Sequence, residues 1–235
     1  MARTRRLRAA GYPLHVTQRG HNHAPCFLDP AEHGLYLGLL AEFAPRHACR
    51  IHAYALMTNH VHLLFTPEDE WGSSRLMKDV TQRYVQHFNA KHKRSGSLWS
   101  GRFHSSIVES REYFLACQRY IELNPVDAGM VSCPSRYPWS SYGSNALGLP
   151  SLLLVPHDEY LALASTDEGR RSAYAAMFKA EFPRALAERI ELAQKGSLPL
   201  GSDEFVARIE AETGVRTRRR KPGPSPGHPR AVRGG

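Results

Sequence analysis

The sequence is poor in cysteine, in long apolar runs and, near its C-terminus, in acidic side chains. Its four cysteines lie far apart and form no C-x-x-C pair, which argues against a zinc ribbon or a disulfide framework and is typical of a reducing cytosol. No apolar run approaches the ~18 residues of a membrane span. The basic N-terminus lacks the apolar stretch of a secretory signal. We therefore expect a cytoplasmic protein that does not enter a membrane.

The 235 residues include 10 Tyr, 9 Phe and 3 Trp, and 42% of them are hydrophobic, which supports a packed core and excludes wholesale disorder. The net charge of +9 is unevenly distributed. Residues 1–150 carry 17 basic and 11 acidic side chains, residues 151–215 carry 7 and 11, and residues 216–235 carry 7 and none. A basic tail on a slightly acidic module is typical of an arm that binds nucleic acid, and it also fits a solubilising tail.

The hydropathy pattern divides the chain into three parts. In residues 1–150 the periodicity predicts the order βαββαβα, and hence an α+β, ferredoxin-like fold with helices packed on an antiparallel sheet. Residues 151–215 predict a helical extension without strands. Residues 216–235 are rich in Pro, Gly and Arg and predict a disordered basic tail. The expected strands are 13–19, 51–57, 60–65 and 102–108, and the expected helices are 29–48, 73–93, 110–124, 157–165, 168–181, 184–195 and 203–213.

Two histidines lie in the third expected strand. His60 and His62 are two residues apart, so their side chains point to the same face of the sheet. Val61, Leu63 and Phe65 point to the other face, which we expect the helices to cover. Two imidazoles on an open face can bind one divalent metal ion. The same spacing also fits two polar residues on a half-exposed strand.

A tyrosine and an asparagine share one face of the expected helix 110–124. Tyr120 and Asn124 are four residues apart, and no other tyrosine in a helix-compatible segment has Asn, Gln, Asp or His at that spacing. A phenol can act as a nucleophile, and an amide oxygen can bind a hard metal ion. Pro125 predicts that the helix ends at Asn124, which would leave that side chain free. A core tyrosine with its hydroxyl at the rim is the alternative.

Basic and aromatic residues are interleaved in residues 71–119, which hold nine basic and three acidic side chains. This mixture suits phosphates and unstacked bases, and it also fits the charged outer face of an ordinary helix. Arg102 and Arg119 are candidates to hold phosphates. Lys78 and Arg83 are candidates to follow a nucleic-acid backbone along the helix. A surface charge or a structural salt bridge is the alternative for each.

The chain resembles the single-tyrosine HUH transposases, and most closely their REP-associated branch. The resemblance lies in three segments that occur in the same order: ALMTNHVHLLF, LWSGRFHSSIVES and RYIELNPVDAGMV. The resemblance covers about residues 12–148. It implies an HUH endonuclease domain in residues 1–150. In that domain Tyr120 is the nucleophile, and His60, His62 and Asn124 bind Mg²⁺ or Mn²⁺.

The resemblance also implies an activity and its partners. The activity is metal-dependent cleavage and rejoining of single-stranded DNA near foldback hairpins through a 5′-phosphotyrosine. The partners are single-stranded DNA with palindromic hairpins, in the nucleoid, and a second copy of the chain in a homodimer. A hairpin-binding protein that does not cut DNA and a metal hydrolase that uses water are the alternatives. The simplest family members are compact catalytic domains, whereas this chain has about 85 further residues.

Deleting residues 216–235 should weaken DNA binding and flatten its dependence on salt, because phosphate contacts by basic side chains release counterions. Binding of the full and the truncated chain to the same hairpin over a series of salt concentrations measures this slope. An unchanged slope would show that the tail does not contact phosphates.

Overall fold

The computed structural model describes residues 10–215, so the predicted tail lies outside the described residues. None of the helices in this range combines the length and the apolar composition needed to cross a membrane. The strands are β1 (Leu14–Arg19), β2 (Cys49–Met57), β3 (His60–Pro67) and β4 (His104–Ile107). The helices are α1 (Pro30–Arg46), α2 (Gly72–Lys91), α3 (Ser110–Asp127), α4 (Tyr142–Leu147), α5 (Asp158–Leu161), α6 (Asp167–Ala176), α7 (Arg184–Gly196) and α8 (Asp203–Thr213), with short 3₁₀ turns at His21–His23, Pro134–Arg136 and Met177–Lys179.

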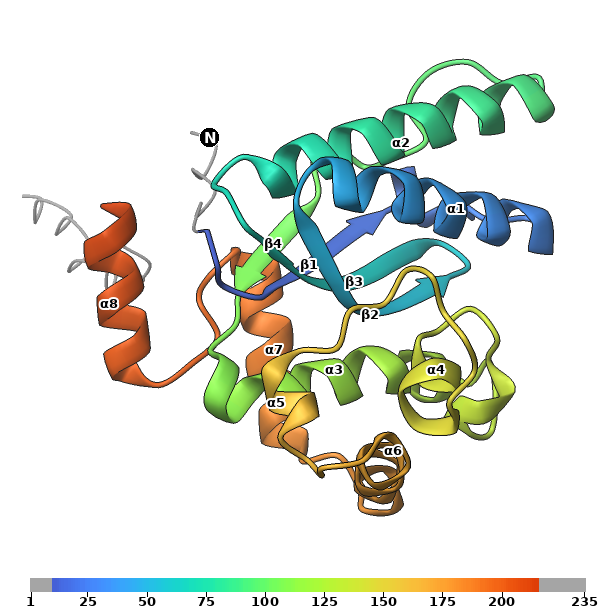
Figure 1. Ribbon diagram of the computed structural model, residues 1–235. Helices are drawn as coiled ribbons and strands as arrows, with labels where there is room; N and C mark the ends of the chain where they lie inside the picture. Colours follow the sequence, from blue (N-terminus) through green and yellow to red (C-terminus); the bar gives the residue numbers. More distant parts are fainter. Residues whose placement is uncertain (1–9, 216–235) are drawn as a thin grey trace, which may run out of the picture.

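The four strands form one sheet in the order β2-β3-β1-β4, and every neighbouring pair is antiparallel. With α1 and α2 between the strands along the chain, this is the βαββαβ order of a ferredoxin-like fold. α1 and α2 cover one face of the sheet, and α3 and α7 lie against the other (Figure 1). The predicted α+β, ferredoxin-like architecture is confirmed.

Side chains of β3 alternate between the two faces of the sheet, as the sequence predicted. The face of His60 and His62 is not open as expected, because α3 and α7 pack against it. Val61, Leu63 and Phe65 are fully buried in the cluster beneath α1 and α2. Leu64 is buried on the opposite face, in the cluster formed with α3 and α7. His62 shares that second face and is 6% exposed. The central strand therefore supports a hydrophobic layer on one side and polar groups on the other.

Two helices begin at the caps that the sequence contains. The Asp29 carboxylate accepts a hydrogen bond from the Glu32 N–H at 3.0 Å, and Pro30 occupies the first position of α1, where no N–H is needed. Ser202 caps α8 by accepting from the Phe205 N–H at 3.1 Å. These caps explain why the predicted starts of α1 and α8 agree with the structure.

α3 continues through Pro125 to Asp127, so the prediction that this helix ends at Asn124 is wrong. Proline lacks an N–H and therefore removes only one bond of the helix, the one to the carbonyl four residues earlier. The following turn is intact, because the Ala128 N–H donates to the Asn124 carbonyl at 2.9 Å. Asn124 is thus a half-buried residue within the helix and not its free end.

The helical extension packs directly against the first part of the chain. Ile190 and Ala193 of α7 are buried, as is Leu200 in the segment that follows. They share one hydrophobic cluster with Phe114 and Ile121 of α3. α3 is therefore covered by the sheet on one side and by residues of the extension on another.

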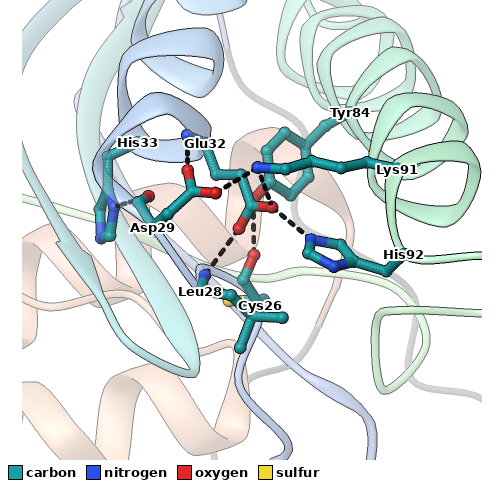
Figure 2. Close-up of polar contacts among 8 residues, drawn as sticks. All are labelled: Cys26, Leu28, Asp29, Glu32, His33, Tyr84, Lys91 and His92. Carbon is teal, nitrogen blue, oxygen red and sulfur yellow. Dashed lines mark hydrogen bonds and ion pairs between the residues drawn. The ribbon is translucent and has the colours of Figure 1, made fainter.

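A buried glutamate joins the start of α1 to the end of α2 (Figure 2). The Glu32 side chain is fully buried, and it accepts hydrogen bonds from the Leu28 N–H at 2.6 Å and the Lys91 ammonium at 3.0 Å. The His92 ring provides a third partner, and Lys91 also pairs with Asp29. Burial alone would raise the pKa of Glu32, but the hydrogen bonds outweigh it and hold the pKa below its ordinary value. The ionised carboxylate therefore fastens α1 to α2.

Replacing Glu32 with Gln should lower the free energy of unfolding at neutral pH by about 2 kcal/mol, because hydrogen bonds to an ionised buried group are lost. Folding lowers the pKa of Glu32. The stability that the ionised carboxylate provides is therefore fully present above the ordinary glutamate pKa, and it disappears as the pH falls through the pKa of Glu32 in the folded protein. The wild-type protein should therefore lose stability in acid more steeply than the variant. Urea unfolding at neutral and acidic pH measures both effects. Asp29→Asn, which keeps the helix cap, is the control; a loss as large as that of Glu32→Gln would contradict the special role of the buried carboxylate.

Candidate active site

A cleft of about 600 Å³ opens on the sheet face that carries α3 and α7. Residues of β1, β3 and β4 line it, together with residues of α3, of α7 and of the loop before β4. His60, His62, Tyr120 and Asn124 all lie in its lining. The structure therefore brings together the four predicted metal and nucleophile residues, which are up to 64 positions apart in the sequence.

The register of the sheet explains why the histidines lie in the cleft. In the pairing of β1 with β3, Thr17 is opposite His62 and Arg19 is opposite His60. In the pairing of β1 with β4, His104 is opposite Thr17. Directly opposed residues share a face of the sheet. Polar side chains of three strands consequently converge at one place.

Both predicted histidine ligands have one ring nitrogen already bonded. Nδ1 of His60 lies 2.7 Å from Oδ1 of Asn59, and Nδ1 of His62 lies 2.9 Å from Nε2 of His15. The ring centroids of His60 and His62 are 4.9 Å apart. Nε2 of each ring is therefore left for a ligand in the cleft.

The two histidines are neutral at physiological pH. Burial, with a smaller effect of the positive charge of Arg19, lowers the pKa of His60 to about 4. Burial also lowers the pKa of His62 well below its ordinary value. A histidine binds metal only through a deprotonated nitrogen, so the neutral charge of both rings meets one requirement of metal binding.

Tyr120 is half-buried on α3 beside these rings. Its ring centroid lies 6.3 Å from that of His62 and 6.1 Å from that of His15. Burial, followed by the negative charge of Glu191, raises the pKa of the Tyr120 phenol above its ordinary value. The phenol is therefore protonated at neutral pH, and it needs a nearby positive charge to act as a nucleophile.

Asn124 completes the set from one helical turn further along α3. Its Nδ2 donates to the Tyr120 carbonyl at 2.8 Å, which leaves Oδ1 for a ligand. Within residues 10–215 no group of three His, Cys, Asp or Glu side chains is placed to hold a metal ion. The Asn124 amide is therefore a candidate third ligand beside the two histidines. Two imidazole nitrogens and an amide oxygen fit a divalent ion such as Mn²⁺ or Mg²⁺.

The two arginines predicted to hold phosphates differ in position, because only Arg102 lies in the cleft. Arg102 is exposed and lines the cleft. Arg119 is only 8% exposed; its guanidinium donates to the Ala180 carbonyl and lies over the rings of Phe178 and Phe182. The structure does not bring Arg119 to the cleft, and a phosphate-holding role does not fit its buried position. Its side chain instead fastens the segment before α7 to α3.

Lys78 and Arg83 lie on the exposed side of α2. α2 covers the face of the sheet opposite to α3, so neither side chain reaches the cleft (Figure 1). Contact of Lys78 and Arg83 with DNA outside the cleft stays a prediction.

The contribution of α7 to the cleft was not predicted from the sequence. Glu191, Gln194 and Lys195 line the cleft, and the Lys195 ammonium pairs with the Glu191 carboxylate at 3.0 Å. α7 is amphipathic, but no local signal in such a helix tells which partner its apolar face covers. Thr17 and Arg19 did carry a signal, because they alternate along β1 and share one of its faces.

Comparisons with known proteins found one matching family model and similar solved structures. Residues 12–124 match the sequence model of the family "Transposase IS200 like". A solved REP-associated tyrosine transposase bound to a REP hairpin is similar over 67% of this chain and 93% of its own, with 19% sequence identity and a TM-score of 0.55. A putative transposase from Deinococcus radiodurans R1 matches over 52% of this chain and 96% of its own, with 24% identity and a TM-score of 0.35. A search of curated proteins found no match.

The likeness to the REP-associated transposase shows a shared fold. The family match includes the whole sheet, α1, α2 and α3 as far as Asn124, and with them His60, His62 and Tyr120. Residues 12–124, just under half of the chain, are therefore similar to the IS200-like transposases.

Proposed function

We propose that the protein is a single-tyrosine transposase that cleaves and rejoins single-stranded DNA beside foldback hairpins. The proposal includes dependence on Mg²⁺ or Mn²⁺ and a 5′-phosphotyrosine intermediate. The observation that carries it is the meeting of His60, His62, Tyr120 and Asn124 in one cleft. A protein that only binds hairpins needs no nucleophile beside a set of metal ligands.

His60, His62 and Asn124 are the residues that would hold the metal ion. When bound, a divalent ion neutralises charge on the scissile phosphate and stabilises the departing 3′-oxygen. The three ligands are neutral and leave the full charge of the ion for the phosphate. Arg19 and Arg102, which also line the cleft, are placed to hold neighbouring phosphates.

Tyr120 supplies the nucleophile. Its phenol gives its proton to water, its oxygen forms a bond to the phosphorus, and the bond from phosphorus to the 3′-oxygen breaks. The 3′-oxygen takes up a proton from water and leaves as a free hydroxyl, while the 5′-phosphate stays on Tyr120. The new ester conserves the phosphodiester energy, so a second 3′-hydroxyl can reverse the step and join a new strand without ATP. α3 carries both Tyr120 and Asn124 and thereby orients the attack.

The proposed substrate is single-stranded DNA that folds into a palindromic hairpin. The similar REP-associated transposase is bound to such a hairpin, and the first 150 residues of this chain carry an excess of basic side chains. One chain contains all four active-site residues. We therefore propose that a monomer cleaves DNA and that a homodimer serves to bring two strands together.

Replacing Tyr120 with Phe should lower the yield of covalent protein–DNA adduct by about 10³-fold or more, because the nucleophilic oxygen is removed. The experiment incubates the protein with labelled single-stranded hairpins and Mn²⁺ and separates the products on a denaturing protein gel. Binding of the same hairpins should change little, since the phenyl ring remains. His62→Ala and chelation of the metal should also remove the linked band.

The other outcomes decide between the alternatives. Tight binding without a linked band for any hairpin in a library would favour a DNA-binding protein that does not cut. Cleavage that survives Tyr120→Phe would favour a hydrolase that uses water. Either result would overturn the proposed function.

Replacing Lys195 with Gln should weaken hairpin binding by about 3- to 10-fold and reduce the salt dependence by about one counterion, because one phosphate contact is lost. Arg184→Gln is the matched control, since Arg184 also pairs with a glutamate one turn away on α7 but does not line the cleft. Titrations of both variants at several salt concentrations make the comparison. An equal or larger effect of Arg184→Gln on hairpin binding would contradict the assignment of α7 to the DNA-binding cleft.

A further inference from the structure

His15 lies on β1 behind the cleft and is 1% exposed. The sheet register places it opposite Leu64, one diagonal step from His62. Its Nε2 is 2.9 Å from Nδ1 of His62, and the two rings are nearly parallel, at 24°. The Gln194 amide donates to the His15 carbonyl at 3.1 Å and ties this point of β1 to α7. His15 therefore contacts His62 and does not itself line the cleft.

A hydrogen bond between two neutral imidazoles has two arrangements. If His62 donates from Nδ1, its Nε2 has a free lone pair and can bind a metal ion. If His15 donates from Nε2 instead, His62 carries its own proton on Nε2 and cannot bind one. The hydrogen-bond partner of His62 thus determines whether its ligand atom is competent.

His60 has no such choice. Asn59 presents Oδ1 to Nδ1 of His60 at 2.7 Å, and its Nδ2 donates to the His23 carbonyl at 3.2 Å. An amide oxygen can only accept, so His60 must carry its proton on Nδ1 and a lone pair on Nε2. His62 has the same form only when His15 accepts.

We propose that His15 is a positioning residue of the metal site: its Nε2 accepts from Nδ1 of His62 and holds the Nε2 lone pair of His62 ready for the ion. The inference rests on the proposed function, because it assigns His62 its ligand form. His15 touches neither the ion nor the DNA.

Stability alone would not select this arrangement. When His15 accepts at Nε2, its proton is on Nδ1, and Nδ1 is buried without a hydrogen-bond partner in the described structure. Buried unpaired N–H groups are rare because they are destabilising. An apolar residue would remove that cost but would leave Nδ1 of His62 unpaired instead. Stability therefore does not favour the histidine, and what it adds is an acceptor for His62.

The test uses two substitutions in the full chain. His15→Phe keeps a ring but removes the acceptor, whereas His15→Gln keeps a polar group that can accept. Mn²⁺ affinity, measured by calorimetry without DNA, should fall by about 10- to 100-fold in His15→Phe and by less than about 3-fold in His15→Gln. The melting temperature of His15→Phe should change little, because one unpaired buried ring nitrogen replaces another.

His52→Phe is the matched control. His52 is 2% exposed on β2 and bonds both the Val155 carbonyl, at 2.7 Å, and the Thr66 hydroxyl, at 2.9 Å. Its replacement should lower the melting temperature and leave Mn²⁺ affinity unchanged. Long-range ¹H–¹⁵N spectra of the metal-free wild-type protein give a second readout, in which the His62 proton should lie on Nδ1. A proton on Nε2 would overturn the proposal.

His60→Ala separates this inference from the proposed function. If the wild-type protein binds Mn²⁺, His60→Ala does not, and His15→Phe binds as tightly as the wild type, only the proposed role of His15 is refuted. If neither the wild-type protein nor His60→Ala binds Mn²⁺, the proposed metal ligands are refuted, and the role of His15 with them.

Discussion

The antiparallel pairing of β1 with β3 is the constraint on which the rest of the structure depends. It places Thr17 opposite His62 and, by the same alternation, buries Leu63 beneath α1 and α2. A slip of one residue would turn every side chain of the strand to the opposite face and would exchange the histidines for valine and leucine. The hydrophobic core therefore specifies the position of the polar site, because a register that misplaces His60 and His62 also exposes apolar surface.

Local patterns were sufficient for the strands and for the motif residues. The alternation along β3 predicted which face carries His60 and His62, and the i, i+4 spacing predicted that Tyr120 and Asn124 share a face of α3. Both periodicities follow from backbone geometry and need no knowledge of the neighbouring elements. The prediction that α3 ends before Pro125 was wrong. A proline near the C-terminal end of a helix removes a single backbone hydrogen bond, and the intact turn after Pro125 outweighs that loss.

Features that depend on tertiary packing were beyond prediction. Arg119 is adjacent to Tyr120 in the sequence, but successive residues of a helix point about 100° apart, and its side chain lies against residues before α7. The approach of α7 to the cleft could not be predicted either, since its apolar face fits many partners. Phe182 from the same region lies 5.9 Å from the Tyr120 ring. The extension thus contacts Tyr120 by packing, through residues that carry no motif.

The cluster shared by α3 and α7 has a consequence for shortened versions of this chain. A gene interrupted by a stop codon after residue 150 still encodes all three motif segments. Its product, however, lacks Ile190, Ala193 and Leu200, which share a buried cluster with Phe114 and Ile121 of α3, the helix that carries Tyr120. Motif searches would record such a remnant as an intact gene. An uninterrupted reading frame through α7 is therefore a better criterion for a functional copy than the motifs themselves.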